Sequence, residues 1–582
     1  MKSKNDIIII ENLSYAYPKS KELVLKNINL RVKEGEFLAI MGKTGAGKTT
    51  LCLALNGIIP QFYENGKIEG EVIVDGLSTY NTPIQKLALS VGMVFQDFES
   101  QIFGVTVEED IGFGLSNIGL PKEEILRRIN EVLSIVRLNG YEKREVGALS
   151  GGELQRLAIA DILAMKPKIL VLDEPTSQLD PIGKEEVFSV ILSLKEKLGI
   201  TTIITEHKSE EIAQYADRVI VLKNGEIALE GHPKDLFKKI DELYDLGVRP
   251  PQVCELSVKI EKQKNINFDS FPLTVDEAYK TYINALSLKK INKQSRLDSI
   301  NSFNKAKDLP IIEVEDLWHT YPNGIHAIQG ISLKIYKGEF LAIIGQNGSG
   351  KTTLVKHFNG LLKPTKGKVI VGGVNTLKST VGMLSRKVGY VFQNPDHQIF
   401  ATSVYEEIAY GPKNMKLSKE EIDKRVKEAL NFVGLEGYEE KNPFLLNKGE
   451  RQRIAFASIF AMRPQVFIVD EPTTGQDYQG SENMMKMLKK LNEKGCTIII
   501  ITHDMRIVAE YAQRIIVLSN GKILADGPTR AIFSQPELLK KSFLAPPQIT
   551  QLSQKLVDYG FKPYTLSVDE MFDQALKILE DK

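Results

Sequence analysis

The chain has 582 residues, of which 42% are hydrophobic and 26% are charged, and its 75 basic residues nearly balance its 74 acidic residues. This length exceeds one ordinary domain, so several hydrophobic cores are expected. A net charge of +1 excludes a global electrostatic attraction to nucleic acid, while local basic patches stay open.

No stretch of the sequence approaches the roughly 20 apolar residues that cross a bilayer, and the apolar run near the start is too short for a secretory signal. Cys52, Cys254 and Cys496 lie far apart, without the spacing of metal ligands. We expect them to be isolated packed thiols in a reducing cytoplasm. If the protein works at a membrane, another protein must bring it there.

The dominant feature is a long internal repeat. A period close to 300 residues indicates a duplicated domain rather than a solenoid. The repeated pairs are "GKTGAGKTT" (42–50) and "GQNGSGKTT" (345–353), "MVFQDFESQIF" (93–103) and "YVFQNPDHQIF" (390–400), "VLDEPTSQLD" (171–180) and "IVDEPTTGQD" (468–477), and "PPQVCELS" (250–257) and "PPQITQLS" (546–553).

In chain order, each half reads as an α/β domain. The runs "EFLAIMG" and "EFLAIIG" enter a glycine loop as buried parallel strands do, and "KILVLDEP" and "QVFIVDEP" are a later strand of the same kind. Between these strands lies an amphipathic helix. Its apolar face comprises Ile125, Ile129, Val132, Leu133 and Val136 in the first half, and Ile422, Val426, Ala429, Leu430 and Val433 in the second. We expect domains at 1–240 and 310–538, C-terminal extensions at 241–284 and 539–582, and a polar linker at 285–309.

Both glycine loops match the phosphate-loop pattern G-x-x-x-x-G-K-[ST]. Glycines at this spacing let backbone N–H groups surround a phosphate at a helix N-terminus. The lysines would reach the β- and γ-phosphates of ATP, and the next threonines would ligate Mg²⁺. The expected residues are Gly42, Gly45, Gly47, Lys48, Thr49 and Thr50, and Gly345, Gly348, Gly350, Lys351, Thr352 and Thr353.

Acidic residues end the later strand of each half. A carboxylate there is costly unless a cation compensates it, so Asp173 and Asp470 are expected to ligate Mg²⁺. The following residues, Glu174 and Glu471, suit a general base that polarises the attacking water. The alternative is a pair of exposed carboxylates at a strand end.

Two further residue types recur beside these strands. Gln96 and Gln393 follow a "VF" strand and are expected to place water and Mg²⁺, although a lone glutamine would be read as a surface residue. His207 and His503 follow β-rich runs and are expected to contact the γ-phosphate, whereas an isolated histidine there would be a packed or exposed residue.

These motifs resemble the ATP-binding-cassette (ABC) family over about residues 8–235 and 311–535. The phosphate loop, glutamine, signature, acidic strand and histidine occur in family order, twice. The resemblance implies ATP hydrolysis with Mg²⁺ in two tandem α/β cassettes, each with an antiparallel β subdomain and a helical subdomain. It also implies that Tyr17 and Tyr321 stack on adenine, with ordinary strand aromatics as the alternative.

In ABC proteins two cassettes associate head to tail, and each ATP lies between one phosphate loop and the other half's signature. The first half has the signature "LSGGE" at 149–153, whereas the second has "LNKGE" at 446–450. Asparagine can still cap a helix, but lysine adds bulk in place of glycine. We expect both sites to bind ATP and the Lys351 site to turn over faster; the alternative is drift tolerated by a duplicated gene. The expected signature contacts are Ser150, Gly151, Gly152 and Glu153, and Asn447, Lys448, Gly449 and Glu450.

The segments after the two glutamines are similar to those of ATPases in energy-coupling factor (ECF) transporters. That family pairs two ATPases with a transmembrane coupling protein and a membrane-embedded substrate-binding protein. The resemblance implies that Asp97, Glu99 and Asp396 meet arginines of the coupling protein, with a solvated loop as the alternative. The first half's "DFESQIF" departs from the usual "NPDxQIF".

The sequence therefore favours the ATPase subunit of an ECF-type importer for a vitamin, vitamin precursor or metal ion, at the inner face of the cell membrane. One alternative is the fused ATPase of a conventional solute importer, which the "QIF" segments disfavour. Another is a ribosome-associated ABC translation factor, which the short linker disfavours. An iron–sulfur recycling relative would need a cysteine-rich N-terminal region. No nucleic-acid partner is expected.

Overall fold

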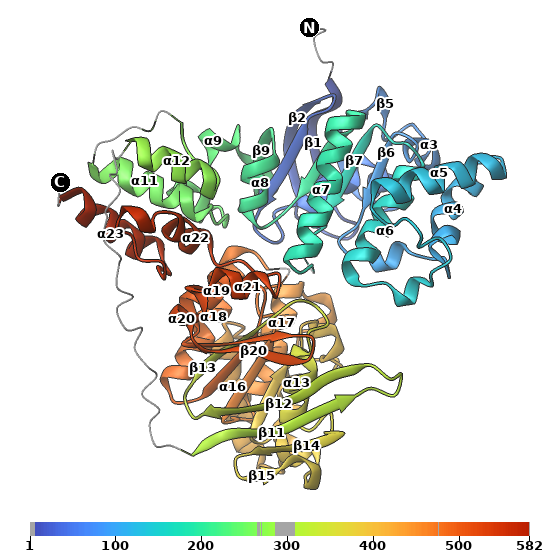
Figure 1. Ribbon diagram of the computed structural model, residues 1–582. Helices are drawn as coiled ribbons and strands as arrows, with labels where there is room; N and C mark the ends of the chain where they lie inside the picture. Colours follow the sequence, from blue (N-terminus) through green and yellow to red (C-terminus); the bar gives the residue numbers. More distant parts are fainter. Residues whose placement is uncertain are drawn as a thin grey trace. The chain divides into compact units, whose positions relative to one another are not determined.

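The computed structural model describes residues 6–63, 65–177, 179–264, 268, 270–285, 309–474 and 476–580. The chain divides into two units, residues 1–281 and 282–582, and each is described by itself (Figure 1). The division falls inside helix α12 (Val275–Ala285). Most of the predicted linker lies outside the described residues, and the predicted domain boundaries stay predictions.

The first unit contains two sheets and several helices. Its strands are β1 (Asp6–Ala16), β2 (Leu25–Lys33), β3 (Phe37–Gly42), β4 (Lys67–Val74), β5 (Leu77–Ser78), β6 (Val91–Val94), β7 (Ile169–Asp173), β8 (Thr201–Thr205), β9 (Arg218–Lys223) and β10 (Glu226–Gly231). Its helices are α1 (Lys48–Leu55), α2 (Ile58–Gln61), α3 (Ile84–Leu87), η1 (Phe98–Gln101), α4 (Val107–Asn117), α5 (Lys122–Ile135), η2 (Val146–Ala148), α6 (Gly151–Ala164), α7 (Pro181–Leu198), α8 (Ser209–Tyr215), α9 (Pro233–Leu236), α10 (Ile240–Asp245), α11 (Gln252–Lys264) and α12.

The second unit repeats this series. Its strands are β11 (Pro310–Thr320), β12 (His326–Tyr336), β13 (Phe340–Ile344), β14 (Lys366–Val371), β15 (Val374–Asn375), β16 (Val388–Val391), β17 (Val466–Asp470), β18 (Thr497–Ile501), β19 (Arg514–Ser519) and β20 (Lys522–Pro528). Its helices are α13 (Lys351–Phe358), η3 (Thr376–Lys378), α14 (Val381–Leu384), η4 (Pro395–His397), α15 (Val404–Asn414), α16 (Lys419–Val433), η5 (Pro443–Leu445), α17 (Lys448–Phe460), α18 (Tyr478–Glu493), α19 (Met505–Tyr511), α20 (Thr529–Phe533), α21 (Pro536–Lys540), α22 (Gln548–Lys555), η6 (Val557–Tyr559) and α23 (Val568–Glu580).

Each unit pairs an antiparallel sheet with a mainly parallel one. The antiparallel sheets have the orders β2-β1-β4-β5 and β12-β11-β14-β15, and the six-stranded sheets have the orders β10-β9-β3-β8-β7-β6 and β16-β17-β18-β13-β19-β20. Every residue of β3, β7 and β8 is buried, as expected for parallel strands covered on both faces. The predicted α/β class is confirmed. The carboxyl ends of these strands meet at one edge, which is where ligands bind in such sheets.

Helices α4, α5 and α6 form a group at one side of the first unit (Figure 1). On α5, Ile129, Val132 and Leu133 are buried, and Val136 directly after it is buried as well. The predicted apolar face is therefore confirmed, with Ile125 half-buried at its edge. On α16 all predicted apolar residues are buried.

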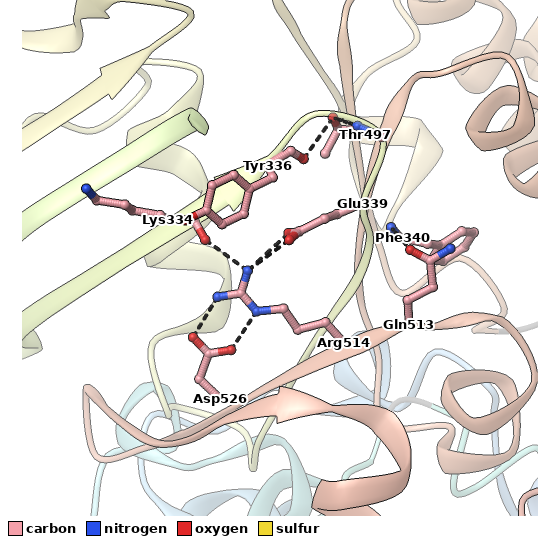
Figure 2. A network of polar contacts seen from close by, with 9 residues as sticks. Lys334, Tyr336, Glu339, Phe340, Thr497, Gln513, Arg514 and Asp526 are labelled. Atoms are coloured by element: carbon pink, nitrogen blue, oxygen red, sulfur yellow. Dashed lines mark hydrogen bonds and ion pairs between the residues drawn. The ribbon is translucent and has the colours of Figure 1, made fainter. Parts of the chain in front are cut away.

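An arginine ties the two sheets of the second unit together (Figure 2). Arg514, at the start of β19, binds Asp526 through two contacts of 2.6 Å. Its Nη1 also donates to Glu339 at 3.1 Å and to the backbone carbonyl of Lys334 at 2.9 Å. Because Lys334 belongs to β12 and Asp526 to β20, one guanidinium joins the antiparallel sheet to the edge of the parallel sheet. In the first unit, Arg218 likewise donates to Glu36 at 2.6 Å and to the backbone carbonyl of Arg31 of β2 at 2.6 Å, and it pairs with Glu230 of β10.

No helix among the described residues is long and apolar enough to span a membrane. The three cysteines are free; Cys52 and Cys254 are buried, and Cys496 is partly so. Burial raises the pKa of the Cys52 and Cys254 thiols well above the ordinary value. These thiols are therefore packing residues, as predicted.

Candidate functional site

The phosphate loop of the first unit joins β3 to α1. Gly47 has a φ of +102°, and a Cβ atom there would lie 3.0 Å from the carbonyl oxygen of Val24, so this position requires glycine. Lys48 begins α1, and its side chain is buried. Its Nζ donates to the carbonyls of Gly42 at 3.0 Å and Lys43 at 3.2 Å. The ammonium therefore lies inside the curl of the loop.

The loop between β13 and α13 repeats this geometry. Gly350 has a φ of +98°, and a Cβ atom there would lie 2.6 Å from the carbonyl oxygen of Ala327. Lys351 Nζ donates to the carbonyls of Gly345 at 2.7 Å and Gln346 at 2.8 Å. Each loop ends at the N-terminus of a helix, where backbone N–H groups and the helix dipole favour the binding of an anion.

A tyrosine stands next to each phosphate loop. The hydroxyl of Tyr17 lies 3.1 Å from Thr50 Oγ1, and that of Tyr321 lies 3.1 Å from Thr353 Oγ1. The hydrogen bonds place both rings, each half-buried, beside the helix that follows the loop. This position is compatible with stacking on a base, which stays a prediction.

Asp173 ends β7 and is almost fully buried. Its Oδ1 accepts a hydrogen bond of 2.5 Å from Thr205 Oγ1, at the end of the neighbouring strand β8. Burial raises the pKa of this carboxyl, while hydrogen bonds from Thr205 and Thr49 oppose the rise. The acid and the phosphate-loop threonine that were predicted to share a metal are therefore adjacent.

Asp470 is held differently in the second unit. Its Oδ2 accepts from Thr352 Oγ1 at 2.9 Å and from the hydroxyl of Tyr390 at 2.8 Å. Tyr390 comes from β16, where the first unit has Met93. Burial raises the pKa of Asp470 and, together with the neighbouring carboxylate, that of the Tyr390 hydroxyl.

The two Asp–Thr pairs fit a magnesium ion. Mg²⁺ prefers oxygen ligands and is usually bound by one or two protein side chains together with substrate phosphates. Each pair supplies a carboxylate and a hydroxyl, and in the second unit Thr352 and Asp470 are 2.9 Å apart. A cation beside the buried carboxylate would also offset the burial that raises its pKa.

Glu174 lies directly after β7 with a φ of +48°, a left-handed conformation that is costly for a residue other than glycine. Its backbone N–H donates to Thr205 Oγ1 at 2.9 Å, which helps to hold this conformation. The carboxylate accepts from Gln96 Nε2 at 2.6 Å and lies 2.8 Å from His207 Nε2. Three of the predicted catalytic residues of the first unit therefore meet.

Glu471 repeats the strained backbone with a φ of +50°. Its Oε1 lies 2.7 Å from His503 Nδ1, and its Oε2 accepts from Thr474 and Thr502, each at 3.3 Å. Gln393 is exposed, and among the described contacts it has no counterpart of the bond from Gln96 to Glu174. The second unit therefore joins its glutamate and histidine but not its glutamine.

The two signature loops have the same backbone design. Ser150 accepts from the Glu153 N–H at 3.3 Å, and Asn447 accepts from the Glu450 N–H at 2.9 Å, each as the first residue of a capping box. The predicted cap by Asn447 is confirmed. Lys448 opens α17 as a half-buried residue. The altered signature therefore differs in the side chain it presents rather than in its helix start.

The acids predicted to meet a partner are all exposed. Asp97 and Glu99 form no ion pair within the described part of the chain. Asp396 binds Arg451 of α17, with Nε 2.7 Å from Oδ1. The sequence did not predict this pair, nor the hydrogen-bond partners of the acids proposed to bind Mg²⁺. These residues lie far apart in the chain and meet only in the fold, so they form no local sequence pattern.

Comparisons with known proteins point to one family. The sequence pattern of the ABC transporter family matches residues 25–177 and 328–474. An ABC transporter ATP-binding protein of Caldanaerobacter subterraneus subsp. tengcongensis is 46% identical over 566 residues, covering 97% of this chain and 98% of that protein. Another, from Methanosarcina mazei, is 40% identical over 577 residues, covering 97% and 96%. The solved structure of cbiO1 from Clostridium perfringens, described as part of the ABC transporter complex cbiONQ, is 40% identical, covers 40% of this chain and 94% of that chain, and has a TM-score of 0.37.

Proposed function

The chain belongs to the family of ABC transporter ATP-binding proteins, and we propose that it is the energy-coupling subunit of an ECF-type importer. Its activity is that of an ATPase, which converts ATP and water to ADP and phosphate. The observation that supports the importer proposal is a pair of exposed apolar clusters, each directly after the glutamine of a cassette.

In the proposed reaction, each phosphate loop binds ATP through its backbone N–H groups and its lysine, Lys48 or Lys351. Thr49 with Asp173, and Thr352 with Asp470, would hold Mg²⁺. When bound, this ion neutralises charge on the β- and γ-phosphates.

Glu174 and Glu471 act as general bases. Each carboxylate accepts a proton from water as the water oxygen bonds to the γ-phosphorus and the bond to the β–γ bridging oxygen breaks. His207 and His503 lie 2.8 Å and 2.7 Å from these carboxylates, so they orient the base, and each is proposed to contact the γ-phosphate.

The two sites are proposed to form by head-to-tail association of the cassettes. The Lys351 site then receives "LSGGE" and the Lys48 site receives "LNKGE". A lysine side chain in place of glycine occupies room next to the γ-phosphate. We expect both sites to bind ATP and the Lys351 site to hydrolyse it faster.

The proposed docking surfaces follow the glutamines. In the first cassette Phe103 and Phe113 are 74% and 56% exposed, with ring centroids 6.1 Å apart. In the second, Phe400 and Tyr410 are 58% and 51% exposed, with centroids 4.7 Å apart. Exposed aromatic residues suit the apolar face of an amphipathic helix of a membrane protein, and the exposed acids that follow the same glutamines would suit basic residues of that helix. The chain would thus work at the cytoplasmic face of the membrane.

The experiment that tests this proposal is affinity purification of the tagged protein from detergent-solubilised membranes of its native host, followed by mass spectrometry. We expect a multi-span protein with arginine-bearing cytoplasmic helices together with a small membrane-embedded binding protein. The binding protein would then identify the imported substrate. Recovery of ribosomal subunits without a membrane partner would contradict the proposal.

A substitution provides the matched control. Phe400→Ser should reduce recovery of the membrane partners, because it removes apolar contact area at the exposed cluster. Leu361→Ser changes a 44% exposed apolar residue outside the cluster and should leave recovery unchanged.

A further inference from the structure

One guanidinium joins the acidic segment after Gln393 to the signature loop of the second cassette. Arg451 Nε lies 2.7 Å from Asp396 Oδ1, and its Nη2 donates to Asp396 Oδ2 at 3.3 Å. The remaining nitrogen, Nη1, donates to the carbonyl of Leu446 at 2.6 Å. Leu446 immediately precedes Asn447, so Arg451 holds both the acid and the start of the altered signature. A planar, forked donor is suited to such a double contact.

A second side chain connects the same two elements. Gln398 follows η4, and its Nε2 donates to the carbonyl of Ala455 at 2.7 Å and to Ser458 Oγ at 3.1 Å, both on α17. Its Oε1 accepts from the N–H of Phe392 at the end of β16, at 3.2 Å. The segment after the glutamine is thus bound to the signature helix at two places.

The first cassette lacks both connections. Leu154 occupies the position of Arg451, and Gln101 occupies that of Gln398. Gln101 turns back to its own strand, where it donates to the carbonyl of Met93 at 3.1 Å and accepts from the N–H of Phe95 at 2.8 Å. Within the described residues, no ion pair or side-chain hydrogen bond joins residues 97–101 to α6.

We propose that Arg451 is a positioning residue that transmits the state of Asp396 to the "LNKGE" signature, and that only the second cassette has this link. Asp396 is 44% exposed at the side chain, whereas Arg451 is 20% exposed, so the acid is the member that a partner can reach. A cationic side chain of a docked membrane protein competes with Arg451 for the carboxylate. Arg451 then loses its contact with Asp396. Without that contact, the hydrogen bond from Arg451 no longer holds the Leu446 carbonyl in place.

This inference rests on the proposed function for the identity of the competing partner, but the link itself belongs to the isolated chain. Neutralising the carboxylate imitates its capture by a partner cation. Asp396→Asn removes the charge and nearly preserves the shape, at an exposed position where folding is not at risk. Glu99→Gln is the matched control, because Glu99 is the equivalent acid and the first cassette has Leu154 at the position of Arg451.

Hydrogen–deuterium exchange of the purified full-length chain tests the link. In Asp396→Asn, the amides of residues 446–450 should exchange about two- to fivefold faster, the range expected from losing a partly exposed ion pair. In Glu99→Gln, residues 149–153 should exchange at the wild-type rate. Arg451→Leu should produce at least the effect of Asp396→Asn, and the double variant should add nothing to Arg451→Leu.

A purely local role for Arg451 predicts a different pattern. If Arg451 only caps the Leu446 carbonyl, Arg451→Leu speeds exchange and Asp396→Asn does not, because Asp396 does not touch residues 446–450. That result, or effects that simply add in the double variant, would overturn the inference.

Kinetics separate the inference from the proposed function. In a Glu471→Gln background, turnover reports the Lys48 site, which is proposed to use the altered signature. Asp396→Asn should there lower kcat about two- to fivefold and leave KM for ATP unchanged, because the signature acts on the transferring phosphate. Faster exchange with unchanged kcat would support the link and contradict the proposed head-to-tail pairing. Unchanged exchange would overturn the link whatever the kinetics show.

Discussion

Asp173 and Asp470 end equivalent strands of the two cassettes, yet different neighbours hold them. Thr205 donates to Asp173 from the adjacent strand β8, whereas Tyr390 donates to Asp470 from β16 on the other side. The hydroxyl comes from a different strand in each case, and each carboxylate is buried beside its phosphate-loop threonine. The carboxylate proposed to bind Mg²⁺ is therefore supported by different partners in the two cassettes, and a hydroxyl reaches it in each.

The two glutamates proposed as general bases, in contrast, are held alike in both cassettes. Glu174 and Glu471 share a left-handed backbone and a histidine contact shorter than 3 Å. Strain of this kind persists only when the surroundings maintain it. The cassettes therefore differ in what supports the acid of the proposed metal site and in the signature, but they agree at the glutamate proposed as general base. The following experiments separate these differences.

The largest expected effect concerns the two bases. Glu471→Gln should lower hydrolysis at the Lys351 site by about 10²- to 10⁴-fold, because it removes the base of the site served by the intact signature, so total turnover should fall to the share that the Lys48 site supplies. Glu174→Gln should lower it less, because the site served by "LNKGE" contributes less to the total. Phosphate release at saturating ATP measures both. Equal losses from the two substitutions would contradict functional asymmetry.

Removing the arginine that joins the sheets should destabilise the second cassette most. Arg514→Met leaves Glu339, whose side chain is 8% exposed, as a buried acid without its cation. Losing one partner of a buried pair costs about 3–5 kcal/mol of unfolding free energy.

Trp318, the single tryptophan of the chain, lies in the second cassette, so its fluorescence during urea unfolding reports that cassette alone. Arg218→Met in the first cassette should leave this transition in place. A shift as large as that of Arg514→Met would mean that the cassettes do not unfold separately.

Acid should destabilise the second cassette through His357. Burial lowers the pKa of this imidazole to about 4, and its Nδ1 lies 2.8 Å from the carbonyl of Thr353. The ordinary pKa of histidine is about 6.5. Between pH 4 and 6.5 this imidazole therefore binds a proton in the unfolded chain but not in the folded chain. The contribution to stability is therefore complete above pH 6.5 and is lost as the pH falls to 4, by about 3 kcal/mol at most.

The first cassette has Ala54 at the equivalent position and lacks this dependence. His357→Ala should therefore flatten the dependence of the Trp318-detected unfolding free energy on pH between 4 and 6.5, even if the variant is less stable overall. A slope equal to that of the wild type would assign the acid sensitivity to other groups.

The smallest effect concerns the signature. In a Glu471→Gln background, Lys448→Gly should raise turnover about tenfold, less than the 10²- to 10³-fold typical of a lost oxyanion donor, because the backbone N–H is present in both. The reciprocal Gly151→Lys in a Glu174→Gln background should lower turnover by a similar factor. A Cβ atom at Gly151 meets nothing within 4 Å, so this lysine is expected to leave its own cassette intact. No change in either direction would favour tolerated drift.

Much of the fold and of the site could be predicted from short stretches of sequence. A phosphate loop is encoded by glycines whose backbone conformation is available to no other residue, as at Gly47 and Gly350. The helix start at Asn447 follows from a capping box that spans only Asn447 to Glu450. The apolar periodicity of α5 and α16 predicted their buried faces, because a helix places every third or fourth residue on one side.

By itself, then, the sequence determined the duplication, the α/β class and the residues that belong to each motif. Only the tertiary structure decided which distant side chains support them. Arg451 reaches Asp396 across 55 residues of chain, and Arg514 reaches the Lys334 carbonyl across 180. Such pairs depend on strand register and on how each helix is rotated against the sheet, and both are set by packing of the whole core rather than by any local pattern.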